Sequence, residues 1–176
     1  MRQTARVNEL AITVIGPDRP GIVADVAEAL AGLGANLTDS TMTRLRGHFA
    51  MTLVCTGPGA DEARNALGPL TADGALLATV RAVEPEAQPD AGGEPYVLSV
   101  HGADRLGIVA AVARVVAGAG GNITDLTTRL AGPLYVLVAE VDVPAGAAQP
   151  LAERLAGVAA ELDVGVSLRR AETDLL

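Results

Sequence analysis

The chain has 176 residues, with 21 acidic side chains against 13 arginines, no lysine and a net charge of −8. This charge repels phosphate backbones and anionic membranes, so we expect neither direct nucleic-acid binding nor a membrane partner. Cys55 is the only cysteine and there are two histidines, which excludes a disulfide framework and the usual zinc ligand sets; we expect no metal and no cofactor. No apolar run approaches a membrane span and no export signal is expected, which favours a cytoplasmic protein.

The first half of the chain predicts six elements. A short apolar strand at 10–15 ends at a glycine, and a helix follows in which Ile22, Val23, Val26, Leu30 and Leu33 recur at helical spacing. Strands at 36–45 and 48–56 flank a turn at 46–47, a second helix is expected at about 60–70, and a last strand at 76–83.

The second half predicts the same six elements. A strand at 96–100 precedes a helix marked by Ile108, Val109, Val112 and Val116. Strands at 122–130 and 134–143 flank a turn at 132–133, followed by a helix at about 147–162 and a strand at 164–170.

An internal repeat joins the two halves. Residues 16–41 and 102–127 align at an offset of 86 without a gap, and 16 of these 26 positions are identical. We therefore predict two homologous domains, at 8–84 and 95–171, joined by a linker at 85–94 that is rich in proline, glycine and acids. Each reads β-α-β-β-α-β, an α+β fold with a four-stranded antiparallel sheet and two helices on one face.

The loop after the first strand of each domain is the most informative motif. It reads Asp18-Arg19-Pro20-Gly21 in one copy and Asp104-Arg105-Leu106-Gly107 in the other. Each loop places a carboxylate beside the free N–H groups of a helix start, a combination that suits a zwitterion with its ammonium on the acid and its carboxylate on the amides. The alternative is that each Asp only caps its helix.

A second repeated element opens the second strand of each domain. Asn36 and Asn122 can donate to and accept from a ligand there, or they can serve only as turn residues after the glycines. Asp39 and Asp125 repeat as well, but no acidic cluster has calcium-loop spacing.

The residues offer little for catalysis. There is no lysine for a Schiff base and no G-x-S-x-G elbow, and His48 and His101 occupy non-equivalent places in the two domains. His101 lies close in sequence to Asp104, but a half-exposed histidine at a strand end is the simpler interpretation. Cys55 lies in an apolar strand, which favours a buried and inert thiol. We predict no catalytic residues and no enzyme activity.

The DRPG loop, the GANLTD element and the β-α-β-β-α-β order resemble the ACT domain, a regulatory module of ferredoxin-like fold that typically binds amino acids. A tandem pair is most similar to the glycine cleavage system transcriptional repressor group. The resemblance implies a ligand site between the first loop and the asparagine of strand two, often between two units. The implied residues are Asp18, Pro20, Gly21, Ile22, Asn36 and Leu37, and in the second domain Asp104, Gly107, Ile108, Asn122 and Ile123. Leu106 departs from the pattern, since proline stands at this place in the first loop.

These observations predict a regulatory protein that senses a small amino acid and modulates a protein partner such as a transcriptional regulator. The alternative is a protein-interaction module that works without a ligand and has vestigial pockets. Each predicted sheet has one face without helices, so either the two domains cover each other or two chains pair. We expect a homodimer.

Overall fold

The computed structural model describes residues 9–84 and 93–171. The chain divides into two compact units, Met1–Ala87 and Gln88–Leu176, which are treated separately below. Positions 85–92 of the predicted linker lie outside the described residues.

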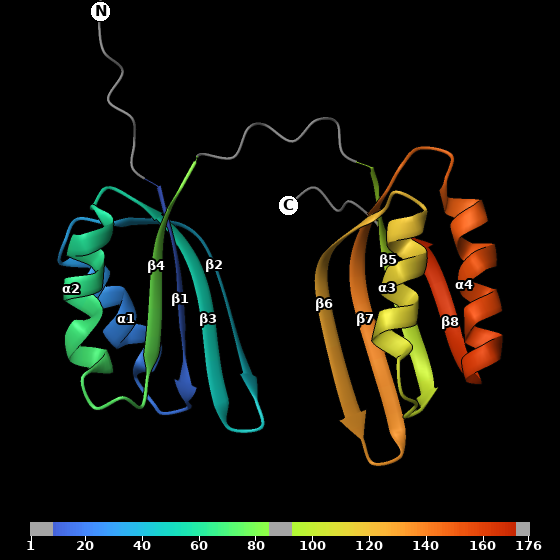
Figure 1. The fold of residues 1–176 in the computed structure, drawn as a ribbon, viewed down its shortest axis with the longest axis horizontal. Helices are drawn as coiled ribbons and strands as arrows, with labels where there is room; N and C mark the ends of the chain where they lie inside the picture. The colour runs from blue at the N-terminus through green and yellow to red at the C-terminus, as the bar shows by residue number, and fades with distance from the viewer. Residues whose placement is uncertain (1–8, 85–92, 172–176) are drawn as a thin grey trace, which may run out of the picture. The chain divides into compact units, whose positions relative to one another are not determined.

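The first unit confirms the predicted order of elements (Figure 1). Its sheet has the order β2-β3-β1-β4, and every neighbouring pair is antiparallel. The elements are β1 (Glu9–Pro17), α1 (Ile22–Ala31), β2 (Asn36–Leu45), β3 (His48–Thr56), α2 (Ala60–Thr71) and β4 (Leu77–Val83).

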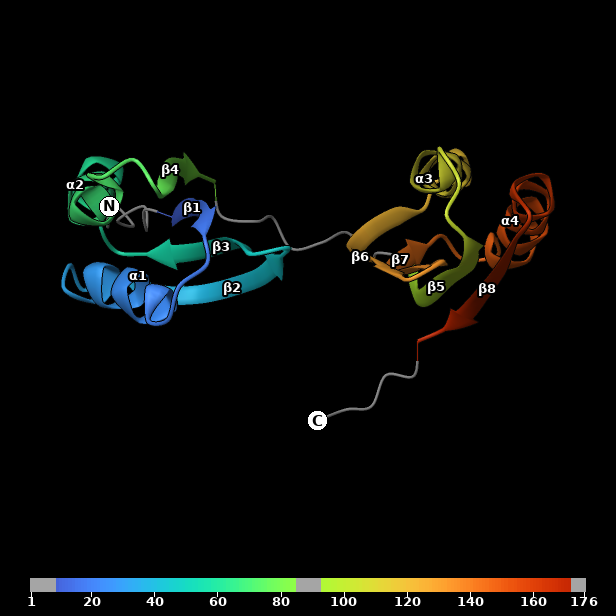
Figure 2. The same cartoon turned by 90° about the horizontal axis from the view of Figure 1, so that it is seen from below.

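The second unit repeats this plan with the sheet order β6-β7-β5-β8. Seen along the strands, both helices of each unit lie on the same side of its sheet (Figure 2). The fold is therefore two ferredoxin-like βαββαβ units, as predicted. Its elements are β5 (Glu94–Ala103), α3 (Ile108–Gly118), β6 (Asn122–Ala131), β7 (Leu134–Val143), α4 (Ala148–Leu162) and β8 (Val164–Arg170).

The first strand of each unit runs further than the apolar pattern indicates. β1 continues to Pro17, which pairs with His48, and β5 begins at Glu94, which pairs with Val143. Both strands lie in the middle of their sheets, so a long neighbour extends the ladder beyond the apolar run. Proline is tolerated at such strand ends, where its missing N–H costs little.

Each unit has its own aliphatic core. In the first, side chains of β1 and β3 that alternate along the strand, such as Ile12 and Leu53, pack under Val26 and Leu30 of α1. Phe49 is the only aromatic side chain of that core and is fully buried. The second core is built in the same way around Leu98, Leu137 and Val112, with helix α4 adding Leu151 and Leu155.

Three residues of the predicted apolar helix stripes lie outside the cores. Val23 is 41% exposed and its counterpart Val109 is 39% exposed, because each follows a buried isoleucine by one residue and so points about 100° away from it around the helix. Leu33 is 38% exposed because α1 already ends at Ala31. The stripe that packs consists of Ile22, Val26 and Leu30, at a strict spacing of four.

Candidate functional site

The first loop, residues 18–21, joins β1 to α1 and is fixed at both ends. The Asp18 N–H donates to the Gly47 carbonyl at 2.9 Å, which ties the loop to the β2–β3 hairpin turn. Gly21 is the N-cap of α1 and has φ 83°, a left-handed conformation that favours glycine. The glycine therefore sets the angle at which the loop enters the helix.

The two charged side chains of this loop form ion pairs with neighbouring elements. The Asp18 carboxylate accepts from Nη1 of Arg44 on β2 at 3.3 Å, and Arg19 contacts Asp25 on α1 at 2.7 Å. No side chain among the described residues caps α1, so the helix-capping alternative for Asp18 is not what the structure shows. The first-turn amides of α1 are left without a side-chain acceptor from the described residues.

The second loop keeps the backbone of the first and changes its ionic partners. Gly107 has φ 87° and again caps the helix without a side-chain hydrogen bond from the described residues. The loop keeps this conformation although Leu106, which is fully exposed, replaces the proline. Arg105 pairs at 3.2 Å with Asp163, the C-cap of α4, and Asp104 has no ion pair within the described part of the chain.

Sequence reasoning placed Ile22 and Ile108 in the ligand site. The structure buries both side chains in the cores, at 3% and 2% exposure, so neither side chain is accessible to a ligand at the loops. Leu37 and Ile123, at the start of β2 and β6, are half-buried and pack against the same cores. Pro20 is exposed on the loop.

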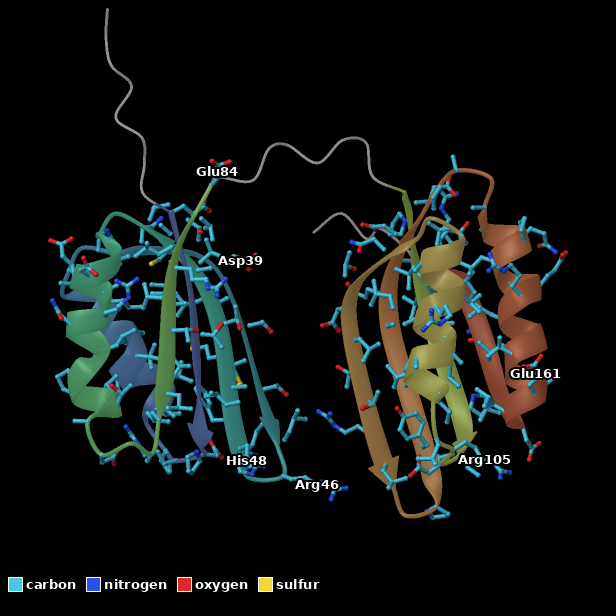
Figure 3. All side chains as sticks on the ribbon, viewed as in Figure 1. Asp39, Arg46, His48, Glu84, Arg105 and Glu161 are labelled. Atoms are coloured by element: carbon cyan, nitrogen blue, oxygen red, sulfur yellow. The ribbon has the colours of Figure 1, made fainter. Side chains whose placement is uncertain are left out.

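The structure does not bring the two halves of the expected site together within one unit. Pro17, beside the first loop, pairs with His48, whereas Asn36 pairs with Thr56 at the other end of β3. The length of strand between those two positions is ~27 Å. Figure 3 shows His48 and Arg46 at one end of the sheet and Asp39 nearer the other.

The second unit has the same separation. Ala103, the last residue before the second loop, pairs with Leu134, and Asn122 pairs with Asp142 at the far end of β7. A bulge follows the asparagine in both units, between Leu37 and Asp39 and between Ile123 and Asp125. The repeat therefore preserves both the separation of the two motifs and the local irregularity beside the asparagine.

A pocket of about 240 Å³ lies on the side of the first loop that faces α2 and β4. The far wall of this pocket cannot be predicted from the sequence, because nothing local in residues 69–76 indicates that they face the first loop. Gly16 makes the close approach possible: a Cβ there would lie 2.5 Å from the Ala75 carbonyl oxygen. The lining residues are Pro17, Asp18, Arg19, Pro69, Leu70, Asp73, Ala75 and Leu76.

The remaining candidates for chemistry lie apart. Cys55 is fully buried in the first core, and this burial raises the pKa of its thiol, as expected of an inert cysteine. His48 is exposed beside the hairpin turn, and His101 is exposed on β5, with its ring against Gly165 of β8. No three His, Cys, Asp or Glu side chains of the described residues converge to hold a metal ion. No helix in the same residues is long and apolar enough to cross a membrane.

Known proteins share this architecture. Over 94% of this chain and 99% of the other, the fold matches a protein of unknown function from Galdieria sulphuraria with a TM-score of 0.80 and 31% identity. It also matches a candidate glycine cleavage system transcriptional repressor, with a TM-score of 0.74 over 95% of this chain and 99% of the other. The identity there is 20%, so this likeness concerns the fold alone.

Short curated relatives match one part of the chain. A UPF0237 protein of Methanopyrus kandleri is 51% identical over 43 residues, which is 24% of this chain and 48% of the relative. A UPF0237 protein of Listeria monocytogenes is 46% identical over 44 residues, 25% of this chain and 49% of the relative. The chain thus spans about half the length of the curated relatives it matches.

The fold and the repeated loops define a protein of two tandem ferredoxin-like α+β modules. The family model of the ACT domain matches residues 8–78 and 94–169. The chain belongs to the ACT domain family, and both of its halves match the family model.

Proposed function

We propose that the protein is a regulatory amino-acid-binding ACT protein, which senses a small amino acid and modulates a protein partner such as a transcriptional regulator, by analogy with the repressor of similar fold. The observation that carries this proposal is the first loop, where the Asp18 carboxylate lines a pocket and the N-terminus of α1, three residues further along the chain, has no side-chain cap from the described residues. An ammonium group suits the carboxylate, and a carboxylate suits the helix amides. A volume of about 240 Å³ favours a small ligand over a cofactor.

A second unit would complete the site. β2 is an edge strand of its sheet, with Asn36 at one end and Leu45 beside the first loop at the other. When two such edges pair antiparallel about a two-fold axis, Asn36 of one lies beside the first loop of its partner. This arrangement would bring Asn36 to Asp18, which a single unit keeps apart, and it supports the expectation of a homodimer.

Regulation would then follow from ligand-dependent assembly. A ligand held by two units favours the paired arrangement and so changes the surface offered to another protein. The ligand can shift the equilibrium between the two arrangements only by the difference in its affinity for them. The net charge of −8 supports a protein target over DNA. We further propose that the protein acts in the cytoplasm and is not an enzyme.

One observation favours the alternative, an interaction module that needs no ligand. The Asp18 carboxylate is already held by Arg44, so an ammonium group must compete with a guanidinium for it. In the second unit Leu130 stands in the place of Arg44, so no guanidinium at that position competes for Asp104. The two loops would therefore differ in affinity for the same ligand.

Thermal unfolding in the presence of each of the twenty amino acids tests the proposal. A ligand at a hundred times its Kd stabilises the native state by ~2.7 kcal/mol, which raises the midpoint by roughly 5 °C or more. We expect one amino acid or a related group to give this shift, and D18A and N36A each to reduce it. E28A removes an exposed acid of α1 and should leave the shift intact. No shift with any amino acid would favour the ligand-independent module.

A further inference from the structure

The sheet of the first unit has one face that no helix of the unit covers, here called the open face. Strand pairing arranges the central part of this face in three rows of four residues, each row crossing β4, β1, β3 and β2. In that strand order the rows are Leu77, Ile15, Ala50 and Thr43; Thr79, Thr13, Thr52 and Thr41; and Arg81, Ala11, Val54 and Asp39.

These rows form an almost uncharged surface. Leu77 is 65% exposed and Ile15 is 46% exposed in the first row, and the middle row consists of threonines alone. The Thr13 and Thr52 hydroxyls lie 3.3 Å apart, and each hydroxyl can both donate and accept. Thr13 and Thr52 can therefore lose water and still keep a hydrogen-bond partner in each other.

The charge of these three rows is confined to two residues at opposite edges of one row. Arg81 lies on β4 and Asp39 on β2, with Ala11 and Val54 between them. Three strand spacings, ~14 Å, separate the two residues within one sheet, which is too far for an ion pair. Each charge therefore lacks a counterpart within the three rows. Glu9 lies one row beyond Arg81 on the neighbouring strand and forms no ion pair with it among the described residues.

A two-fold axis supplies that counterpart. If two open faces stack about an axis that runs along the strands between β1 and β3, β4 of one copy lies over β2 of the other. Arg81 then faces Asp39 of the second copy at both edges, and each threonine of the middle row faces a threonine. The ~30° rotation usual for stacked sheets displaces the row ends by ~4 Å, which an arginine side chain can span.

We propose that the open face of the first unit binds the open face of the first unit in a second copy of this chain. The open face of the second unit fits less well. Its corresponding row reads Arg169, Val97, Glu140 and Asp125, so it has the same end charges but carries Glu140 in the middle. Stacking onto that row would bury the Glu140 carboxylate against Val97 or Ala11, without a cation to pair with it.

The predicted interface is small. With strands ~4.8 Å apart and same-face residues ~6.8 Å apart, the three rows and the two flanking rows cover ~600 Å² on each copy. One flanking row carries Glu9 at the start of β1, a carboxylate at the rim of the interface and not in its central rows. This lies below the ~800 Å² per partner of a standard interface, so we expect reversible association that depends on concentration.

Charge reversal tests the proposal in the full-length protein by sedimentation equilibrium over a range of concentrations. R81D places a carboxylate against Asp39 of the second copy at both edges, and D39R places two guanidinium groups together in the same way. Each should weaken association by roughly tenfold or more. The double variant D39R/R81D reverses both charges and should restore association.

R169D is the matched control, because it makes the same change in the second unit and should not alter association. Circular dichroism and thermal unfolding verify that each variant folds. Undiminished association of R81D and D39R would overturn the proposal, and so would a double variant as weak as the single ones. Sensitivity to R169D but not to R81D would assign the association to the second unit instead.

This association is independent of the amino-acid site. D18A and N36A should leave the concentration-dependent association measured without ligand unchanged, and R81D should leave any amino-acid-dependent thermal shift in place. The two proposals can therefore fail separately.

Discussion

Gly16 allows two segments far apart in the sequence to meet. A Cβ at this position would lie 2.5 Å from the Ala75 carbonyl oxygen and 2.6 Å from a methyl carbon of Leu76, both on the far wall of the pocket. Its counterpart Gly102 is less crowded, since the nearest atom is Cγ1 of Val164 at 2.8 Å and the nearest backbone atom is the Val164 Cα at 3.1 Å. The nearest backbone contact is thus shorter at Gly16, at 2.5 Å, than at Gly102, at 3.1 Å.

Replacing each glycine by alanine should therefore have unequal effects. We expect G16A to lower the free energy of unfolding by ~1 to 3 kcal/mol, because it forces the 75–76 backbone away from β1. We expect a smaller loss for G102A, because its nearest backbone contact is longer and a smaller displacement relieves it. Urea unfolding of both variants measures the difference, and equal losses would contradict this account.

The residues of the first loop could be found from sequence, but their partners could not. The repeat identifies Asp18 and Asp104 as equivalent, and the glycines that follow predict a special backbone conformation. Arg44, which neutralises Asp18, lies 26 residues further along the chain. Only the register of β2 against β3 brings Arg44 to the loop, and a single sequence does not reveal this register.

The elements themselves follow closely from local patterns. Glycines after α1 and α3 end the helices, and the turns at 46–47 and 132–133 lie between strands whose bounds were nearly all predicted. Strands β1 and β5 are longer than predicted at both ends, because pairing with a long neighbour extends a strand past its apolar residues. Val23 shows a second limit of local patterns. It is apolar and yet exposed, so apolar character alone does not tell which helix residues point into the core.

The two hairpin turns place different residue types in the left-handed conformation. Gly132-Pro133 places glycine at the left-handed position, with φ 60°, whereas Arg46 precedes Gly47 and itself has φ 50°. A non-glycine residue in that conformation costs ~1 kcal/mol or more, and asparagine tolerates it better.

R46N should therefore stabilise the first unit by ~0.5 to 1 kcal/mol. R46A removes the same side chain without gaining tolerance of the left-handed conformation, so it should give no such benefit. Denaturant midpoints of the two variants give the comparison. The explanation fails if both variants are equally stable.

At the scale of the whole molecule, stability resides in two separate hydrophobic clusters. One is formed by residues of the first unit alone, around Phe49, and the other by residues of the second, around Leu98 and Leu137. A unit of this size buries only ~60 to 65% of the surface that its unfolded chain exposes, so each has a modest margin of stability.

We expect fragments 1–87 and 88–176 to fold separately. Each should show a cooperative denaturant transition with a midpoint close to that of its unit in the whole chain, since each core lies within one unit. Far-UV circular dichroism in urea measures this. A fragment without a cooperative transition would mean that its unit depends on the rest of the chain.

The sequence predicted the motifs of the ligand site better than their arrangement. Asp18 and Asn36 were expected to act together, yet they lie at opposite ends of the same sheet. The reason is elementary: β1 and β2 both pair antiparallel with β3, so they run in the same direction, and the end of one lies far from the start of the other. A contact between them requires a second unit, which no pattern within one unit can place.

The way the chain enters and leaves each unit bears on how such a protein arises. Glu9 at the start of β1 pairs with Val83 at the end of β4, and in the other unit the Ala171 N–H donates to the Pro95 carbonyl at 2.9 Å. The chain thus enters and leaves a unit side by side, on neighbouring strands. A gene segment that encodes one unit can therefore be duplicated or inserted into another gene without the chain having to pass through an existing core. Such a unit can be transferred between proteins, both in evolution and in protein engineering.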